Sequence, residues 1–175
     1  MHQSQRTIIS EATTRAELDE ARALIRGFVA WARLRYAEEI TFVERYFDEA
    51  SFEAELSGLP GKYARPGGRL LLARDDGRAV GCVALRDLGQ GVCEMKRLYV
   101  DPACQAKGVG KSLVLALIAE AKKAGYSKMR LDTGPKQIEA QALYLRIGFS
   151  FIGPYSEMPD ELRSWLVFME LDLTR

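Results

Sequence analysis

The hydrophobic pattern of this chain changes its period near residue 69, and that change narrows the folds the chain can adopt. Up to about residue 36, apolar residues recur at helical spacing behind a capping box of Thr14 and Glu17. A weaker helical pattern covers residues 42–59. From residue 69 onward, short apolar runs alternate with polar residues, as strands do. The pattern therefore predicts a fold that combines helices with a sheet.

Three strands follow one another closely after the change of period. Residues 69–74 and 79–86 flank Asp75-Asp76-Gly77-Arg78, in which Asp-Gly is a strong hairpin signal. A third strand is predicted over residues 92–100. Because strands joined by such short turns pair in the antiparallel direction, we expect an antiparallel meander.

The second half of the chain alternates strands with helices. A helix with one apolar side follows residue 108 and ends near Gly125. A strand near residues 128–131, a helix over 137–147, and strands over 149–153 and 165–173 complete the order. This order predicts the α/β class with a mixed sheet. No repeat or linker interrupts it, so residues 1–175 are expected to form one domain.

The composition removes several classes of function. A formal net charge of +1 gives no electrostatic case for binding nucleic acid or an anionic membrane. His2 is the one histidine, so histidine triads and histidine zinc sites are excluded. Cys82, Cys93 and Cys104 match no zinc spacing and are expected to be reduced thiols of a cytoplasmic protein. We expect no metal.

The segment Gln105-Ala106-Lys107-Gly108-Val109-Gly110-Lys111 joins a predicted strand to a predicted helix. Glycines there let backbone N–H groups turn toward a ligand, and a helix N-terminus favours an anion. A plain turn fits these residues as well. A Walker loop would need glycine in place of Gln105, and a dinucleotide fingerprint would need glycine in place of Leu113. Both of those phosphate motifs are excluded.

What remains is Q-x-x-G-x-G after a strand ending Leu98-Tyr99-Val100-Asp101-Pro102, and it resembles the pyrophosphate motif of the GNAT superfamily of N-acetyltransferases. Residues 94–100 resemble the fourth strand of that fold, and residues 140–149 resemble its A-x-x-L-Y-x-x-x-G-F signature. The resemblance covers about the whole chain. It implies a mixed, mostly antiparallel sheet of about seven strands with about four helices, in which the fourth and fifth strands splay apart.

The resemblance also implies acetyl-CoA as co-substrate and the residues that bind it. The pantetheine arm would pair with Leu98 and Val100 as an added strand, and the N–H of Leu98 would face the thioester oxygen. Loop N–H groups would hold the pyrophosphate. The expected cofactor-binding residues are Leu98, Tyr99, Val100, Gln105, Ala106, Lys107, Gly108, Val109, Gly110, Lys111, Ser112 and Gln137.

Two of these positions depart from the family pattern. Position 106 is often glycine in the family, and Ala106 should be tolerable here if its φ is negative, since only its amide is used. Gln137 stands where asparagine is frequent, which leaves its side-chain contact with the cofactor open.

Glu94 and Tyr144 are the candidates for proton transfer. An alkyl amine has a pKa near ~10 and must lose a proton to attack a thioester, which a general base assists. The resemblance implies that Glu94 is this base, directly or through water, and that Tyr144 is the acid for the departing thiolate. Each has a structural alternative: Glu94 as an ion pair with Lys96, Arg97 or a neighbouring strand, and Tyr144 as a packed aromatic.

The expected function is direct acetyl transfer to a primary amine of a small molecule or peptide, by a monomer or homodimer. Two alternatives stay open: an acyl-CoA-binding regulatory module without turnover, and a structural protein whose loop is only a turn. The acidic segment 38–55 either attracts a cationic acceptor or is a solvated helix face. Tyr63, Tyr155 and Trp165 are candidate walls for the acceptor, and residues 154–164 a candidate lid.

Overall fold

The centre of the molecule is one seven-stranded sheet in the order β1-β2-β3-β4-β5-β7-β6. The computed structural model describes residues 7–175, so His2 lies outside the described residues. All neighbouring strands are antiparallel except β4 and β5, which are parallel. This confirms the α/β class, the meander and the mixed sheet. The strands are β1 (Ile8–Glu11), β2 (Arg69–Asp75), β3 (Arg78–Gly89), β4 (Val92–Val100), β5 (Lys128–Thr133), β6 (Ser150–Ile152) and β7 (Val167–Asp172).

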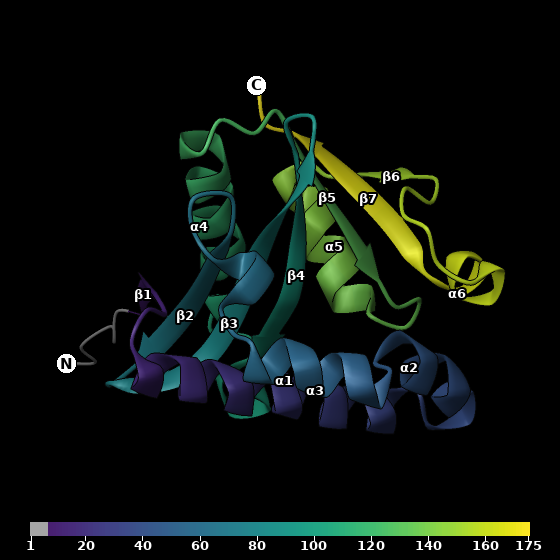
Figure 1. Ribbon diagram of the computed structural model, residues 1–175, viewed down its shortest axis with the longest axis horizontal. Helices are drawn as coiled ribbons and strands as arrows, with labels where there is room; N and C mark the ends of the chain where they lie inside the picture. The colour runs from purple at the N-terminus through teal and green to yellow at the C-terminus, as the bar shows by residue number, and fades with distance from the viewer. Residues whose placement is uncertain (1–6) are drawn as a thin grey trace.

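Six α-helices surround the sheet in the described part of the chain, against about four expected (Figure 1). Within residues 42–59, Phe47 ends one helix and Asp48 caps the next by accepting a hydrogen bond from Ser51 N. Another short helix lies inside the expected lid. None of the described helices combines the length and apolar composition needed to cross a bilayer. The helices are α1 (Arg15–Arg35), α2 (Ile40–Tyr46), α3 (Glu49–Ser57), α4 (Val109–Lys123), α5 (Ile138–Ile147) and α6 (Asp160–Trp165), with 3₁₀ turns η1 (Ala37–Glu39), η2 (Gly61–Tyr63) and η3 (Pro102–Cys104).

Both faces of the sheet are covered, because successive side chains of a strand point to opposite faces. Leu71 and Ala73 of β2 belong to the core that includes α4, whereas Leu70 and Leu72 belong to the core that includes α1. Figure 1 shows α1 crossing the lower ends of the strands and α4 standing beside them. The three cysteines are buried and free: Cys82, Cys93 and Cys104.

β4 and β5 separate after only three residue pairs. Their parallel pairing covers Val92, Cys93 and Glu94 of β4. Beyond that point β4 continues beside β3 to Val100, and β5 continues beside β7 to Thr133. The strands beyond Glu94 therefore face a gap within the sheet, which confirms the expected splay.

A β-bulge in β4 lies where the two strands separate. Ala84 pairs with Lys96 and Cys82 pairs with Tyr99, so β4 has one residue more than β3 over this stretch. Arg97 lies in the bulge with a φ of 60°, in the left-handed region that favours glycine. Such a conformation costs a residue with a side chain on the order of 1–3 kcal/mol. The bulge bends β4 at the point where the gap opens.

Candidate active site

The loop before α4 presents main-chain N–H groups at the start of a helix. Gly108, with a φ of 77°, is the N-cap of α4, and its first turn receives no side-chain cap. Ser112 N bonds to Gly108 O at 3.0 Å, so the amides of Val109, Gly110 and Lys111 are the unpaired donors of the first helical turn. These donors and the helix dipole suit an anion.

Ala106 has a φ of 67°, so the negative φ under which alanine was expected to be tolerable is not present. The loop requires the left-handed conformation at this position, where the Cβ of an alanine is crowded and glycine is not. The side chain is exposed, so no packing around it offsets the strain. Alanine is accommodated here at a cost of roughly 1–2 kcal/mol.

Gln105 and Lys107 of the same loop make contacts within the protein. Gln105 Nε2 donates to Val100 O at 3.1 Å and thereby ties the loop to the end of β4. Lys107 Nζ lies 3.5 Å from Asp75 Oδ2, in an exposed ion pair. Both contacts help to hold the loop in its conformation.

Gln137 and Tyr99 are two of the expected cofactor-binding residues, and their side chains make contacts within the protein. Gln137 lines the pocket in the gap, but its Oε1 accepts a hydrogen bond from Gly134 N at 2.7 Å. Gly134 is tightly enclosed, since a Cβ there would lie 2.1 Å from the hydroxyl of Tyr36. The ring of Tyr99 lies toward α1, 5.9 Å from the ring of Phe28, so its side chain does not enter the gap.

Leu98 and Val100 direct their N–H groups into the gap. Asp101 N donates to Val80 O at 2.8 Å, on the β3 side of β4. Because amides two residues apart point to the same edge of a strand, the amide of Tyr99 also faces β3. The amides of Leu98 and Val100 therefore face the opposite edge, where β5 has moved away. An extended molecule in the gap can pair with them as a strand would.

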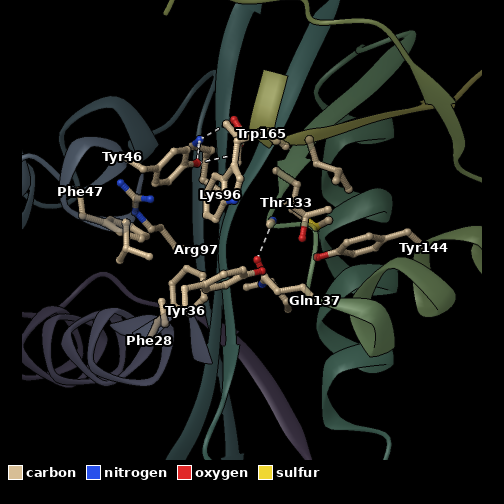
Figure 2. A pocket seen from close by; sticks show the side chains of 18 residues that line it. Phe28, Tyr36, Tyr46, Phe47, Lys96, Arg97, Thr133, Gln137, Tyr144 and Trp165 are labelled. Carbon is tan, nitrogen blue, oxygen red and sulfur yellow. Dashed lines mark hydrogen bonds and ion pairs between the residues drawn. The ribbon is translucent and has the colours of Figure 1, made fainter. Parts of the chain in front are cut away.

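A first pocket occupies the gap, and its lining includes residues of α1, α2, β4, β5 and α5. Figure 2 shows Tyr144 of α5 entering from one side with its hydroxyl toward the centre, close to Thr133. Burial, and then the charge of Asp132, raises the pKa of Tyr144, so its phenol stays protonated. Thr133 Oγ1 is buried and has no hydrogen-bond partner among the described residues. The first pocket thus holds a protonated phenol and an unused hydroxyl.

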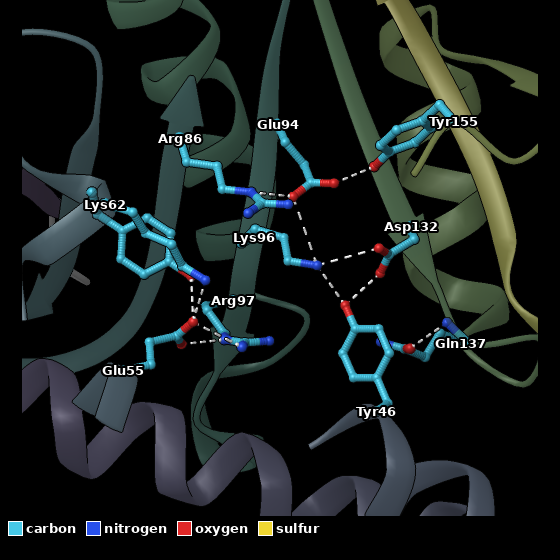
Figure 3. Close-up of polar contacts among 12 residues, drawn as sticks. Tyr46, Glu55, Lys62, Arg86, Glu94, Lys96, Arg97, Asp132, Gln137 and Tyr155 are labelled. Atoms are coloured by element: carbon cyan, nitrogen blue, oxygen red, sulfur yellow. Dashed lines mark hydrogen bonds and ion pairs between the residues drawn. The ribbon is translucent and has the colours of Figure 1, made fainter. Parts of the chain in front are cut away.

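Glu94 borders a second pocket, which neighbours the first. Its side chain is 1% exposed. Arg86, its cross-strand partner on β3, donates from Nε to Glu94 Oε1 at 2.7 Å (Figure 3). The hydroxyl of Tyr155 donates to Glu94 Oε2 at 2.6 Å, and burial together with the charge of Glu94 raises the pKa of Tyr155. The ion pair considered as a structural alternative is therefore present, and the same carboxylate borders a pocket.

Five residues line both pockets, and we call them the shared wall. Three come from the ends of β4 and β5 at the gap, and two come from the end of α2 and the residue after it. They are Tyr46, Phe47, Lys96, Arg97 and Asp132. Tyr144 borders only the first pocket and Glu94 only the second. The two predicted catalytic residues therefore lie on opposite sides of the shared wall.

Lys96, Asp132 and Tyr46 form a buried hydrogen-bonded triad in the shared wall (Figure 3). Lys96 Nζ donates to Tyr46 OH at 2.6 Å and to Asp132 Oδ2 at 3.2 Å, and Tyr46 OH donates to Asp132 Oδ1 at 2.5 Å. Burial lowers the pKa of Lys96, but the charges of Asp132, Tyr46 and Glu94 outweigh it and raise the pKa. Burial also raises the pKa of Tyr46 to about 12. Lys96 therefore stays charged and does not act as a base.

Glu55 of α3 is held by several donors at the edge of the second pocket. Arg97 bonds to both of its oxygens, at 2.8 and 3.1 Å, and Lys62 Nζ lies 2.8 Å away. Burial raises the pKa of Glu55, but hydrogen bonds and charge from Arg97 and Lys62 outweigh it and lower the pKa to about 2. Tyr63, expected to be a wall for the acceptor, instead donates its hydroxyl to Glu55 at 3.0 Å.

Sequence reasoning did not identify Arg86, Asp132 or Tyr46 as site residues. One of them carried a usable signal. Arg86 lies opposite Glu94 on β3, but the register shifts between Asp87 and Gly89, so counting back from the turn would have placed Asp87 there instead. Asp132 ends a buried strand, where polar side chains in α/β sheets often meet ligands. Tyr46 carried no such signal, because α2 approaches the sheet only in the tertiary fold.

The acidic segment and the expected lid are only partly at the site. Of the seven acidic side chains in residues 38–55, Asp48 and Glu55 line the second pocket. Residues 156–159 and Leu162 also line it, whereas Trp165 lines the first pocket. Within residues 7–175, no group of three or more His, Cys, Asp and Glu side chains is arranged to hold a metal ion.

Comparison with known proteins finds one family. Its model, described as the acetyltransferase (GNAT) family, matches residues 28–149. An uncharacterized N-acetyltransferase of Schizosaccharomyces pombe is 34% identical over 169 residues, which cover 95% of each chain. An IAA acetyltransferase of Azospirillum brasilense is 38% identical over 112 residues, covering 63% of this chain and 71% of its own length. The structure of an N-acetyltransferase of Thermoplasma acidophilum in complex with coenzyme A has the same fold, with a TM-score of 0.69, 20% identity, and coverage of 95% of this chain and 99% of its own.

Proposed function

The chain belongs to the acetyltransferase (GNAT) family and is an acyltransferase, and we propose that it moves the acetyl group of acetyl-CoA directly to a primary amine of a small molecule or peptide. The observation that carries this proposal is the shared wall between the two pockets. A thioester held in the first pocket and an amine held in the second would meet beside Lys96 and Asp132. Transfer needs no intermediate bound to the protein in that arrangement.

The first pocket and the loop before α4 have the groups that acetyl-CoA requires. The amides of Leu98 and Val100 would pair with the pantetheine arm, and the first-turn amides of α4 would bind the pyrophosphate, with Lys107 and Lys111 nearby. The unpartnered hydroxyl of Thr133 is a further donor inside the pocket. Bound there, acetyl-CoA supplies an activated acetyl carbon. The Leu98 amide is the donor for the thioester oxygen as that oxygen gains charge.

Glu94 is the base in this proposal. The amine nitrogen bonds to the acetyl carbon as the carbon–sulfur bond breaks, and the amine proton passes toward Glu94. Because the Glu94 side chain is 1% exposed and already accepts hydrogen bonds from Arg86 and Tyr155, we propose that one water carries the proton. Lys96 Nζ, 3.8 Å from Glu94, stays protonated and stabilises the carboxylate.

Tyr144 serves the departing sulfur on the other side of the shared wall. Its raised pKa keeps the phenol protonated at neutral pH, so it is available as a hydrogen-bond donor. The same raised pKa makes it a weak acid, and we therefore propose that Tyr144 stabilises the thiolate by a hydrogen bond as it leaves.

Two measurements test the proposed function. Acetyl-CoA at about 100 times its Kd should stabilise the protein against unfolding by about 2.7 kcal/mol. Free thiol should then appear when a panel of primary amines is added, with an acetylated product detected by mass. Coenzyme A without an acetyl group is the matched control, since it should bind and release no additional thiol.

The two alternatives have distinct outcomes. Stabilisation by acetyl-CoA or a longer acyl-CoA without thiol release on any amine identifies a binding module without turnover. No stabilisation by any acyl-CoA rejects both the enzyme and the binding module, and leaves the loop as a plain turn.

A further inference from the structure

We propose that the acceptor amine also carries a carboxylate, and that Arg86 binds this carboxylate in the second pocket together with Lys62 and Arg97. The inference rests on the proposed acetyl transfer and adds the chemical class of its acceptor, an amino acid or another acid that bears a primary amine. Three features of the second pocket support it: the balance of charge, the unused donors of Arg86, and an unpartnered hydroxyl.

Cations outnumber carboxylates in the inner part of the second pocket. Each carboxylate there already has a cationic partner, and Glu55 and Glu94 each have two. The side chains of Arg97 and Lys96 are 9% and 11% exposed, whereas those of Arg86 and Lys62 are 31% and 43% exposed, so the surplus of one positive charge lies in a partly exposed space. A bound anion would balance it. The four cations are Lys62, Arg86, Lys96 and Arg97, and the three carboxylates are Glu55, Glu94 and Asp132.

Arg86 has hydrogen-bonding capacity that the protein does not use. Its Nε donates to Glu94, whereas its two terminal nitrogens make no hydrogen bond within residues 7–175. Arg97 likewise uses Nε and Nη2 on Glu55 and keeps Nη1. Figure 3 shows Arg86, Lys62 and Arg97 around one space, with Lys96 beside it. The terminal nitrogens of an arginine match the two oxygens of a carboxylate.

Ser156 supplies a second, independent indication. Its hydroxyl oxygen is buried without a partner among the described residues, and the residue lines the same pocket. An unsatisfied buried hydroxyl is unfavourable, and a carboxylate oxygen of a ligand would accept its hydrogen bond. Ser156 follows Tyr155, whose hydroxyl holds Glu94, so the ligand and the proposed base would share one loop.

The mouth of the pocket has a different balance of charge. Asp48 and Glu157 are exposed there, and Arg45 is paired with Glu161. These two carboxylates favour the approach of an ammonium group, and the inner cations favour a carboxylate behind it. The ammonium groups of a polyamine would be attracted by the carboxylates at the mouth and repelled by the cations inside. A zwitterion has one charge for each of the two regions.

The test compares amines that differ only in the carboxylate. Thiol release with acetyl-CoA is measured for alanine, alaninamide and ethylamine, and for phenylalanine, phenylalaninamide and phenethylamine. Rates are divided by the neutral fraction of each amine, because the three have different amine pKa values. Within at least one set, kcat/KM for the amino acid should exceed that of its amide and amine by at least about tenfold.

Arg86→Lys keeps a charge beside Glu94 and removes the planar fork. It should raise KM for the preferred amino acid roughly 10- to 100-fold. Because Arg86 also donates to Glu94, any loss from that changed contact should fall equally on the amino acid and its amide, so the preference between the two should drop by the same roughly 10- to 100-fold. Arg74→Lys is the matched control, because Arg74 is a half-buried arginine paired with Glu20 that lines neither pocket. It should leave the preference intact.

Two results overturn the inference and leave the proposed function in place: equal rates for amino acids, amides and amines, or an equal loss on all three in Arg86→Lys. A third result is different. Binding of acetyl-CoA with no thiol release on any amine rejects the proposed function, and the inference with it.

Discussion

The first and second pockets have the shared wall in common, and outside that wall they are built from different chemical groups. The first pocket and the loop before α4 offer mainly backbone donors: the amides of Leu98 and Val100 and the first turn of α4. The second offers charged side chains from α3, β3 and β4. Backbone donors depend on chain shape, which many sequences can adopt, whereas side-chain donors depend on particular residues. Under the proposed function, binding of the acetyl donor would depend on the fold, and the choice of the amine acceptor would depend on the particular residues of this chain.

Among substitutions that test this difference between the two pockets, the largest effect on turnover is expected at Glu94, in the second pocket. Glu94→Gln should lower turnover about 10²- to 10⁴-fold, since it removes the proposed base. Stabilisation by acetyl-CoA should not change, because Glu94 does not line the first pocket.

Glu120→Gln is the matched control for that variant. Glu120 also accepts from an arginine, Arg69, at 2.9 Å, but lines neither pocket. Asp132→Asn separates the remaining possibility. If Asp132→Asn lowers turnover by the amount expected for the base and Glu94→Gln does not, the base is the carboxylate of the shared wall.

A smaller effect is expected on the donor side, from Tyr144→Phe. Loss of the hydrogen bond to the departing thiolate should lower kcat about 10²-fold, as the loss of one donor to developing negative charge does. Because burial raises the pKa of Tyr144, neither limb of the pH profile near neutrality should disappear. The loss should be the same for every amine, unlike a change in the second pocket.

Tyr126→Phe serves as the control for Tyr144→Phe. Burial raises the pKa of Tyr126 to about 12, and its hydroxyl donates to Gly67 O at 2.7 Å outside both pockets. If Tyr144→Phe lowered kcat for only some of the amines, Tyr144 would also act on the amine, and the two pockets would not have the separate roles proposed for them.

The smallest effect is expected in the loop before α4. Ala106→Gly should raise the free energy of unfolding by about 0.5–1 kcal/mol, because relief of the left-handed strain exceeds the extra entropy of an unfolded glycine. Chemical denaturation measures it. Ala124→Gly, at a φ of −75°, should lower stability instead. A loss in Ala106→Gly would show that this loop does not hold the conformation described.

The sequence predicted the parts of the molecule in which local pattern decides the structure. The capping box of α1, the hairpin of β2 and β3, and the strand at residues 92–100 all have short-range causes. The loop before α4 was predicted from its glycines, but the φ of Ala106 was not, since an alanine gives no sign of a left-handed backbone. The short α6 was missed because Pro159 and the polar residues after it resemble a loop.

The same distinction between local sequence pattern and tertiary packing applies to the residues of the candidate site. Glu94 was found from its place on a strand, and its partner Arg86 depends on register across a turn. Tyr46 and Glu55 reach the second pocket from α2 and α3, far from β4 in the sequence. Such contacts arise only when helices pack on the sheet, and no local pattern contains them. The charge of the second pocket was therefore not readable in advance.

The three residue pairs between β4 and β5 have a mechanical consequence. The strands β1–β4 form one arm and β5–β7–β6 form another, and these arms are joined near one end only. A molecule that bonds to Leu98 and Val100 completes an interrupted ladder and acts as the missing strand. Loading the donor would then stiffen the sheet itself, and release of the product would loosen it.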